Sequence, residues 1–564
     1  MRTLNTSPSL SLHAVAGTHV VALGIDMPEQ MAGGLLGFSI WRREQPEGEW
    51  RALEGLKYFK GVKAGGGEGA AGSTTSTEFH PIQDFFWSDF TVRPGREYEY
   101  RVVAQAGRPG QLQPIAELSA KVKTESNDHK QKHAVYFNRG VSGSQAFVRK
   151  FGSGPFEQIA AEKPWVWEWL SRGLVEGLRD FIRTATGSGW AIRGAVYEFE
   201  YEPVLTELAQ AARRGADVQV VWAAMTDSES AQKVTEDNRE AIERVFAGST
   251  ATLMPRTQSG DIPHNKFFVL LKGGKPVAVW TGSTNITTGG IFGHSNVGHL
   301  MRDKRVAGQY LSYWELLKKD VKKADLTKHT GTQLPDTWFS GKFKEKISEV
   351  VFSPRPSVAA LDWYAELIRQ SDRPAFITVP FGLDKRFEKV MAQQTARRLI
   401  YVISDRQDKD LQTGAIQNNP FNKTAFGTLL KDNSNLAGWI KERLTGLNKV
   451  NYLHTKYLLI DPLGDAPWVI SGSANFSENS VRNNDENMLV LRGDKRVADI
   501  YFGEFMRIFR HFYFRDIAAA AKSKSEQQQE RIYLNEDSEW VKKHYDPAHP
   551  SFAMREYFGG KVKG

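Results

Sequence analysis

The chain has 564 residues, which is too long for one hydrophobic core, so two to four domains are expected. Its 40% hydrophobic and 25% charged residues are typical of an ordinary globular protein. The absence of cysteine excludes disulfides, thiolate zinc sites and cysteine nucleophiles. The net charge of +9 favours acidic partners, either nucleic acid or anionic lipid, without choosing between them.

Hydropathy and the N-terminus give no sign of membrane insertion or secretion. The sequence has no run of about 20 apolar residues, so no transmembrane segment is expected. Residues 1–6 do not combine a basic region with an apolar one, so no secretory signal is predicted. We therefore expect a cytoplasmic protein, with export that uses no N-terminal signal as the alternative.

The first 125 residues predict an all-β sandwich. Short alternating runs, such as residues 38–42, are separated by turns rich in Gly, Pro and Ser. Residues 93–102 resemble part of the fibronectin type III domain, in which a tyrosine closes the corner before a late strand. The resemblance implies a docking or spacer module, so we expect residues 1–125 to contact a protein partner and not to carry out a reaction.

The rest of the chain predicts two similar halves, at residues 126–330 and 345–520, followed by a tail at 521–564 that packs on the body. An apolar strand opens each half. Strand, helix and strand then follow, at 191–199, 202–214 and 218–222 in the first half and at 375–381, 385–397 and 399–404 in the second. This alternation predicts an α/β sheet with helices on its faces in each half.

Each half then carries the same four polar residues, 190 positions apart. A His–Lys pair opens an apolar strand in each, and a Gly-Ser-x-Asn segment ends the next strand of a predicted hairpin. The sets are His264, Lys266, Ser283 and Asn285, and His454, Lys456, Ser473 and Asn475, with offsets of 2, 19 and 21 in both. Residues two apart on a strand share a face, so each His and Lys should point the same way. We therefore predict one oxyanion site built from two half-sites.

These sets resemble the half-sites of the phospholipase D superfamily, written HxKxxxxD followed by GSxN. The second copy fits in full, including Asp461, whereas the first has Leu271 at the aspartate position. The resemblance covers about residues 133–515. It implies duplicated α/β sandwich halves that form one pseudo-symmetric body with a shared active site. Because both half-sites lie on one chain, it also implies a monomer.

The resemblance further implies phosphodiester cleavage through a phosphohistidine, with no metal or other cofactor. One neutral imidazole would attack the phosphorus, and a second imidazolium would protonate the departing alkoxide. Lys266 and Lys456 would neutralise the non-bridging oxygens, and hydrogen bonds to the phosphate would come from Asn285, Asn475 and the hydroxyls of Ser283 and Ser473. Water would complete hydrolysis, while an alcohol would give transphosphatidylation.

A fifth polar position, at offset 32, is Asn296 in the first copy and Glu486 in the second. The resemblance implies that this residue holds the ring of a catalytic histidine. A carboxylate favours the imidazolium, whereas an amide orients the ring without charging it. We therefore predict that His454, paired with Glu486, begins as the protonated general acid. His264, paired with Asn296, would then begin as the neutral nucleophile.

Two substrate classes remain open. Hydrolysis of phospholipids is the leading interpretation, because the lipid-acting branch of the superfamily also carries both half-sites on one chain. Cleavage of DNA or RNA by the same chemistry is the alternative, and the basic balance suits it. A third interpretation is an inactive scaffold with a vestigial site, against which the intact second motif argues.

Overall fold

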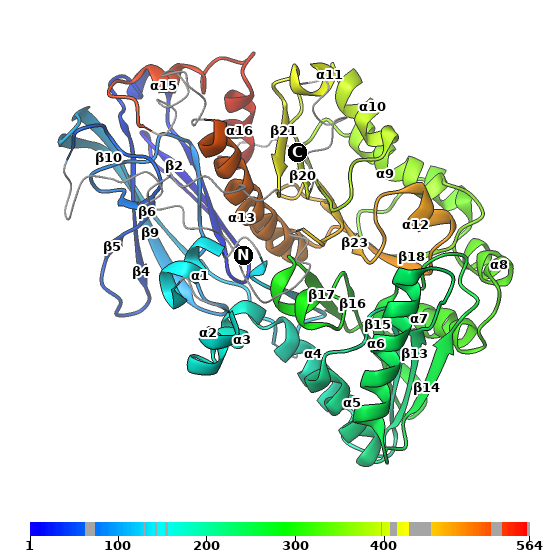
Figure 1. The fold of residues 1–564 in the computed structure, drawn as a ribbon. Coiled ribbons are helices and arrows are strands. Elements are labelled where there is room, and N and C mark those ends of the chain that lie inside the picture. The colour runs from blue at the N-terminus through cyan, green and yellow to red at the C-terminus, as the bar shows by residue number, and fades with distance from the viewer. Residues whose placement is uncertain are drawn as a thin grey trace.

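The computed structural model describes residues 1–62, 74–128, 130–140, 144–152, 156–395, 397–405, 414–427, 453–520 and 533–560. An all-β region at the N-terminus is followed by two α/β halves, and the last residues return to the N-terminal region (Figure 1). The predicted fold class, duplicated α/β halves preceded by an all-β region, is confirmed. The predicted domain boundaries stay predictions.

The N-terminal region contains two antiparallel sheets among the described residues, in the orders β1-β2-β3-β8 and β10-β9-β4-β5, with β6 and β7 as a separate pair. The Tyr98 hydroxyl accepts a hydrogen bond from the Arg93 backbone NH (3.0 Å), which closes the corner before β9. The resemblance to fibronectin type III stays a prediction. The elements are β1 (Arg2–Thr6), β2 (Ser11–Ala16), β3 (Val21–Asp26), η1 (Glu29–Met31), β4 (Gly37–Glu44), β5 (Arg51–Ala52), β6 (Glu54–Gly55), β7 (Thr75–Ser76), β8 (Phe86–Asp89), β9 (Glu97–Arg108) and β10 (Gln111–Lys123).

The first half is built on a mixed sheet in the order β11-β17-β16-β15-β12-β13-β14. Strand β12 pairs parallel with β13 and antiparallel with β15, so the sheet changes direction beside the His264 strand. The elements are β11 (His133–Phe137), α1 (Ser144–Phe151), α2 (Phe156–Glu162), α3 (Val166–Ser171), α4 (Leu174–Arg183), β12 (Trp190–Val196), α5 (Glu202–Arg213), β13 (Asp217–Ala223), α6 (Glu229–Phe246), β14 (Thr252–Arg256), β15 (Lys266–Lys272), β16 (Lys275–Gly282), η3 (Gly289–Gly293), β17 (Val297–Met301) and α7 (Lys304–Lys318).

The second half repeats this topology in the order β18-β24-β23-β22-β19-β20-β21. Here β19 takes the place of β12, parallel to β20 and antiparallel to β22. Helices α8 (Lys323–Gln333) and η4 (Asp336–Ser340) connect the halves. The elements are β18 (Ile347–Ser353), α9 (Ala359–Gln370), β19 (Ala375–Val379), α10 (Lys385–Gln393), β20 (Ile400–Ser404), α11 (Gly414–Gln417), β21 (Asn422–Phe426), β22 (Tyr457–Ile460), β23 (Trp468–Gly472), α12 (Glu478–Arg482), β24 (Glu486–Arg492) and α13 (Lys495–Ala520).

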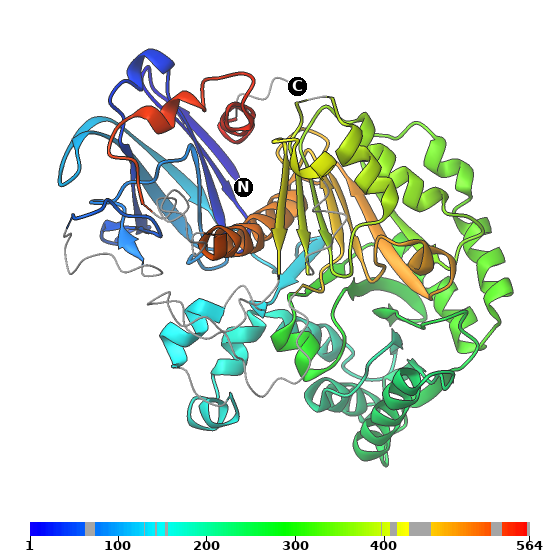
Figure 2. The ribbon, with the colours of Figure 1, turned by 45° about the horizontal axis from the view of Figure 1, so that its top comes forward.

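The two halves share a hydrophobic core around α7 and α13, the helices that come after the last strand of each sheet. One cluster of buried side chains includes Phe267 and Trp314 of the first half and Phe376 and Phe505 of the second. Helix α13 also packs on β2 and β8 of the N-terminal region, so it lies between that region and the sheets (Figure 2). The relative position of the two half-sites is therefore fixed by packing and not by a flexible linker.

The C-terminal segment packs on the N-terminal region through α15 (Glu539–Lys542) and α16 (Pro550–Phe558). Trp540 is buried among the sandwich side chains, and its indole NH donates to the Leu35 carbonyl (2.9 Å). Residues 521–532, where the predicted tail begins, lie outside the described residues. Within the described chain, none of the helices has both the length and the apolar character that crossing a bilayer requires.

Candidate active site

Two histidines, one from each half, meet where the two sheets face each other. His264 lies just before β15 and His454 just before β22, the equivalent strand. Their ring centroids are 6.3 Å apart, and the two residues are only 8% and 7% exposed. Reacting atoms approach to about 3 to 3.5 Å before a bond forms. One tetrahedral phosphorus can therefore lie between the two rings.

Backbone hydrogen bonds between the halves fix this meeting point. The NH of His454 donates to the Ser295 carbonyl (3.1 Å), and the NH of Asp485 donates to the Ile262 carbonyl (3.0 Å). Ser295 and Asp485 occupy equivalent positions, each directly before the fifth polar position of its half. The fifth residue of each half is consequently carried to the histidine of the other half.

The ring partners are therefore exchanged relative to the prediction. Nδ1 of His264 lies 2.9 and 3.0 Å from the carboxylate oxygens of Glu486. Nδ1 of His454 lies 3.0 Å from Oδ1 of Asn296 and 3.1 Å from the Ser283 carbonyl oxygen. The predicted pairs, His454 with Glu486 and His264 with Asn296, are wrong because they assumed that each ring partner comes from the same half.

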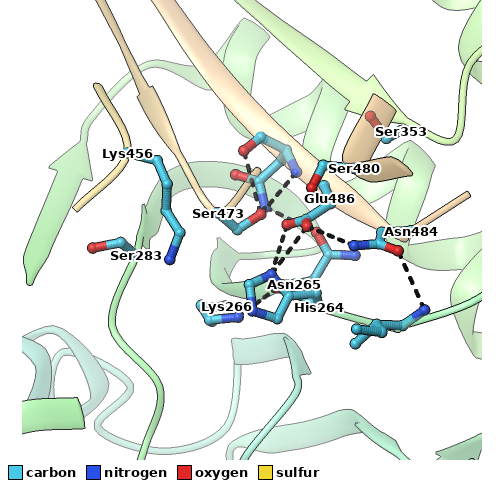
Figure 3. A network of polar contacts seen from close by, with 12 residues as sticks. His264, Asn265, Lys266, Ser283, Ser353, Lys456, Ser473, Ser480, Asn484 and Glu486 are labelled. Carbon is cyan, nitrogen blue, oxygen red and sulfur yellow. Dashed lines mark hydrogen bonds and ion pairs between the residues drawn. The ribbon is translucent and has the colours of Figure 1, made fainter. Parts of the chain in front are cut away.

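Glu486 is fully buried and held from its other side as well (Figure 3). The side-chain NH of Asn484 donates to the Glu486 carboxylate (3.1 Å), and its amide oxygen accepts from the Ile262 backbone NH (3.4 Å). Burial alone would raise the pKa of Glu486, but His264, Lys266 and a hydrogen bond from Ser473 lower it below its usual value. The carboxylate is thus ionised and fixed against the ring of His264.

Ser283 and Asn296 form the corresponding support around His454. The Ser283 hydroxyl donates to Oδ1 of Asn296 (2.7 Å) and accepts from the Val297 NH (3.1 Å). The Asn296 amide also donates to the Gly290 carbonyl (2.7 Å). Because both contacts of the His454 Nδ1 are to acceptor oxygens, this nitrogen carries a proton and Nε2 is left without one in the neutral ring.

The lysines and asparagines of the two sets surround the same space. Nζ of Lys266 donates to the carbonyl of His264 (2.7 Å) and Nζ of Lys456 to that of His454 (2.8 Å). Figure 3 shows Lys456 directed toward the region of His264 and Lys266. The amide oxygens of Asn285 and Asn475 are buried with no hydrogen-bond partner among the described residues. Buried polar groups without a protein partner are expected where a polar ligand binds.

Burial keeps both imidazoles neutral. It lowers the pKa of His264 to about 4, although Glu486 acts in the opposite direction. It lowers the pKa of His454 well below the usual value, and the charges of Lys456 and His294 add to this effect. Burial likewise lowers the pKa of Lys266 to about 7 and that of Lys456 well below its usual value. An anion bound among these groups would favour their protonated forms.

Three further side chains near the histidines were not predicted from the sequence. Glu198 accepts a hydrogen bond from the side-chain NH of Asn285. The ring of Phe381, which is 49% exposed, lies 6.5 Å from that of His454, and the ring of His294 lies 5.6 Å from it.

Strand register gives a signal that could have found two of them. Val196, at the end of β12, pairs with Lys266, and Thr378 of β19 pairs with Tyr457. Tyr457 corresponds to Phe267, which pairs with Ala195, so Glu198 and Phe381 each lie three residues after equivalent positions of the two central strands. A comparison of the residues just after the central strand of each half would have drawn attention to both.

The aspartate of the second motif lies apart from the two histidines. The Asp461 carboxylate accepts a hydrogen bond from the Tyr557 hydroxyl of α16 (3.1 Å), so it anchors the C-terminal segment. Leu271 takes its place in the first half, and the hairpin turn there is made by Gly273 and Gly274 at φ of 56° and 73°. The missing aspartate therefore leaves the hairpin of the first half intact.

Three of the solved structures that this chain resembles have low sequence identity to it. Polyphosphate kinase from Porphyromonas gingivalis is 12% identical with a TM-score of 0.36, covering 70% of this chain and 54% of the kinase, so this chain spans about half the length of that protein. Yeast tyrosyl-DNA phosphodiesterase is 14% identical with a TM-score of 0.33 and coverage of 57% and 85%. NucT from Helicobacter pylori is 17% identical with a TM-score of 0.23 and coverage of 29% and 97%.

Sequence comparison gives a clearer result. No curated protein matches the chain. The family model described as "Cardiolipin synthase, PLD-like domain" matches it twice, at residues 178–317 and 364–509, which together make up half of the sequence. Each match contains one of the two histidines that face each other. The chain belongs to the family of phospholipase D-like domains.

Proposed function

We propose that this protein cleaves phosphodiesters through a phosphohistidine intermediate without a metal ion, and that its substrates are phospholipids. The observation that carries the proposal is the 6.3 Å separation of two buried imidazoles from equivalent half-sites. Lysines and amides from both halves surround the space between them. The description of the matched family as cardiolipin synthase supports a lipid substrate, and the exposed ring of Phe381 offers an apolar contact beside His454.

His264 acts as the nucleophile in this proposal. Its neutral ring donates from Nδ1 to Glu486, which leaves the lone pair of Nε2 free to attack phosphorus. The P–N bond forms as the bond to the departing alkoxide breaks, and the phosphorylated ring becomes cationic. The ionised Glu486 compensates this new charge. The Glu486 carboxylate thus stabilises the covalent intermediate, and it does not keep His264 protonated before substrate binds.

His454 acts as the general acid. Acceptor oxygens of Ser283 and Asn296 hold its Nδ1–H, so Nε2 can give a proton to the leaving alkoxide. The negative charge of bound substrate raises the pKa of His454, so the ring takes up a proton from solvent and becomes the imidazolium. The neutral ring then takes a proton from water as it attacks the phosphohistidine. This proposal keeps the predicted roles of the two histidines. Their physical basis is now the pairing of His264 with Glu486 and of His454 with Asn296.

The remaining polar residues bind or position. Lys266, Lys456, Asn285 and Asn475 contact the non-bridging oxygens, to which the amides donate through their NH2 groups; one NH of Asn285 remains bonded to Glu198. The hydroxyls of Ser283 and Ser473 were predicted to donate to the phosphate; in this proposal, because both are fully buried and bonded to neighbouring groups, they position the ring partners, and Asn296 holds the ring of His454. The expected monomer, cytoplasmic location and protein partner of the N-terminal region remain predictions.

The test incubates purified protein in EDTA with phosphatidylcholine and phosphatidylglycerol vesicles and, separately, with plasmid and single-stranded DNA. The variants His264→Asn and His454→Asn are assayed beside the unsubstituted protein, after thermal unfolding has shown that they are equally stable. Release of a headgroup that both variants lose, with phosphate mapped to His264 by mass spectrometry, is the expected result. DNA cleavage lost in both variants would move the substrate to nucleic acid. A label on His454 would reverse the roles, and the absence of every product would overturn the proposal.

A further inference from the structure

Glu198 is a carboxylate beside the two half-sites, whose lysines, asparagines and histidines are called the pocket below, and the proposed reaction has no step for it. It lies just after β12, is partly buried, and accepts a hydrogen bond from Asn285. Its backbone is fixed, because the Ile286 NH donates to its carbonyl (3.1 Å). Burial raises the pKa of Glu198, whereas Lys266, Asn285 and Lys456 act to lower it. The carboxylate therefore borders the same space as both lysines.

Among the described residues of the second half, no carboxylate stands at the position equivalent to Glu198. Phe381 stands at the corresponding place after β19 and puts an exposed ring there. Binding of a phosphate by two such half-sites thus does not require an acid at this position. Glu198 adds one negative charge on one side only of a pocket that is otherwise built by duplication.

The charges of the pocket balance with Glu198 and do not balance without it. Among the described residues around the two rings, Lys266, Lys456, Glu486 and Glu198 sum to zero when a bound anion holds both lysines in their charged forms and both imidazoles are neutral. A phosphodiester adds one negative charge. Because an uncompensated charge in a buried site is costly, its binding favours the uptake of one proton.

Other titratable groups act on these residues from neighbouring elements. Asp237, Glu200 and Tyr197 interact electrostatically with Glu198, and His264 and His294 with His454. Asp237 is paired with Lys233 (2.9 Å) on the exposed side of α6. Burial and the charge of Glu198 raise the pKa of Glu200 to about 7. Glu198 is the acid of this segment that bonds directly to a residue of the duplicated set.

Resting on the proposed function, we propose that Glu198 makes the pocket selective for the single negative charge of a phosphodiester and couples its binding to protonation of His454. The proton taken up is the one that the leaving alkoxide receives. The product of hydrolysis is a phosphomonoester, whose dianion would need a second proton in the same pocket. Glu198 therefore also disfavours retention of the product.

The test compares Glu198→Gln with the protein and with Glu200→Gln. Glutamine keeps the size of the side chain and an oxygen that accepts from Asn285. The control makes the same change of charge two residues along the same segment, on a side chain outside the duplicated set. Affinities are measured for dimethyl phosphate, a monoanion, and for methyl phosphate at a pH where it is a dianion. Calorimetry in buffers with different heats of ionisation counts the protons taken up.

In Glu198→Gln we expect the affinity for methyl phosphate to rise about tenfold relative to dimethyl phosphate, as one unit charge at this range allows. Proton uptake with dimethyl phosphate should fall, and the basic limb of the kcat profile should move to lower pH. If the affinity ratio and the proton uptake do not change in Glu198→Gln, or change equally in Glu200→Gln, the inference about Glu198 is overturned and the proposed function is unaffected. Dimethyl phosphate binding that is indifferent to Lys456→Ala would remove the proposed function as well.

Discussion

The two half-sites have the same residues at the same spacing, yet their surroundings are opposite. The imidazole of the first half contacts a carboxylate, Glu486, and Asn285 of the same half donates to a second carboxylate, Glu198. The imidazole of the second half contacts the amide of Asn296 and a backbone carbonyl, with the aromatic Phe381 nearby. Duplication gives the two half-sites the same backbone frame. The two histidines differ because side chains from the opposite half, across the seam where the halves meet, or from outside the motif lie beside them. The difference lies in charge, so its consequences can be measured.

The largest effect is expected from removing each histidine and varying the leaving group. His264→Asn removes the nucleophile, so we expect loss of activity beyond about 10⁴-fold for every substrate. His454→Asn removes the acid, which costs about 10² to 10⁴-fold with an alkyl leaving group. With a nitrophenyl phosphodiester, whose leaving group needs no proton, formation of the phosphohistidine should be largely restored, while its hydrolysis still lacks the base. The burst of nitrophenol released after rapid mixing measures the first step, and a burst restored in His264→Asn instead would reverse the two roles.

The ring partners provide the next test. Glu486→Gln keeps the shape of the partner of His264 but removes the charge that stabilises the cationic phosphohistidine. Loss of such a preorganised charge contact costs about 10² to 10³-fold. The loss should appear in the rate at which labelled enzyme forms after rapid mixing. An unchanged rate of labelling would mean that the carboxylate does not serve the intermediate.

A smaller effect is expected when the second half-site is made to resemble the first. In Asn296→Asp the new carboxylate would contact Nδ1 of His454 and raise the pKa of that ring by about one unit or more. Because His454 acts as the acid, the basic limb of the kcat profile should move to higher pH. The pH dependence of kcat measures this shift, and movement of the acidic limb alone would assign the titration to another group.

The sequence predicted the frame of the site and its principal residues. Strand, helix and strand recur in both halves, and the offsets within each half place one His, Lys, Ser and Asn at the ends of hairpin strands where the two halves meet. Some bounds were shorter than predicted: β12 ends at Val196 and α10 at Gln393, earlier than the apolar pattern suggested. Val196 is the residue that pairs with the first residue of β15, so the ladder ends there.

The sequence did not predict which ring partner serves which histidine. Offsets describe distances along one half, whereas Glu486 and Asn296 act across the seam, through bonds such as that from the Asp485 NH to the Ile262 carbonyl. Glu198 was missed for a different reason. It belongs to no motif, and its proximity to Asn285 depends on the register of β12 with β15. Contacts between elements, and not the composition of either half, set the differences between the half-sites.

The two histidines should also differ in their effect on stability at acidic pH. Both have a folded-state pKa below the unfolded value of about 6.5, so the unfolded chain binds more protons. Above about pH 6.5 both rings are neutral in the folded and the unfolded chain, so they do not affect the pH dependence of the free energy of unfolding. As the pH falls through 6.5 toward the folded pKa, this free energy decreases, by up to about 3 kcal/mol for His264.

His454 has no carboxylate partner in the part of the chain that the structure describes, so His454→Asn should remove more of this pH dependence than His264→Asn. Urea unfolding of the protein and both variants between about pH 4 and 7 measures the difference. Equal slopes in the two variants would show that Glu486 does not distinguish the rings in the resting protein.

The smallest effect is expected at Phe381, where the second half exposes an aromatic ring in place of Glu198. Phe381→Ser removes apolar surface beside His454 without touching the groups that hold either ring. Burying an aromatic side chain against a lipid contributes at most about 2 to 3 kcal/mol, and this ring is already half in contact with protein. We therefore expect KM for long-chain phospholipids to rise a few-fold, with kcat and the kinetics of a water-soluble phosphodiester unchanged. A change in kcat for the soluble substrate would instead place Phe381 among the residues that position His454, because only that role acts on both substrates alike.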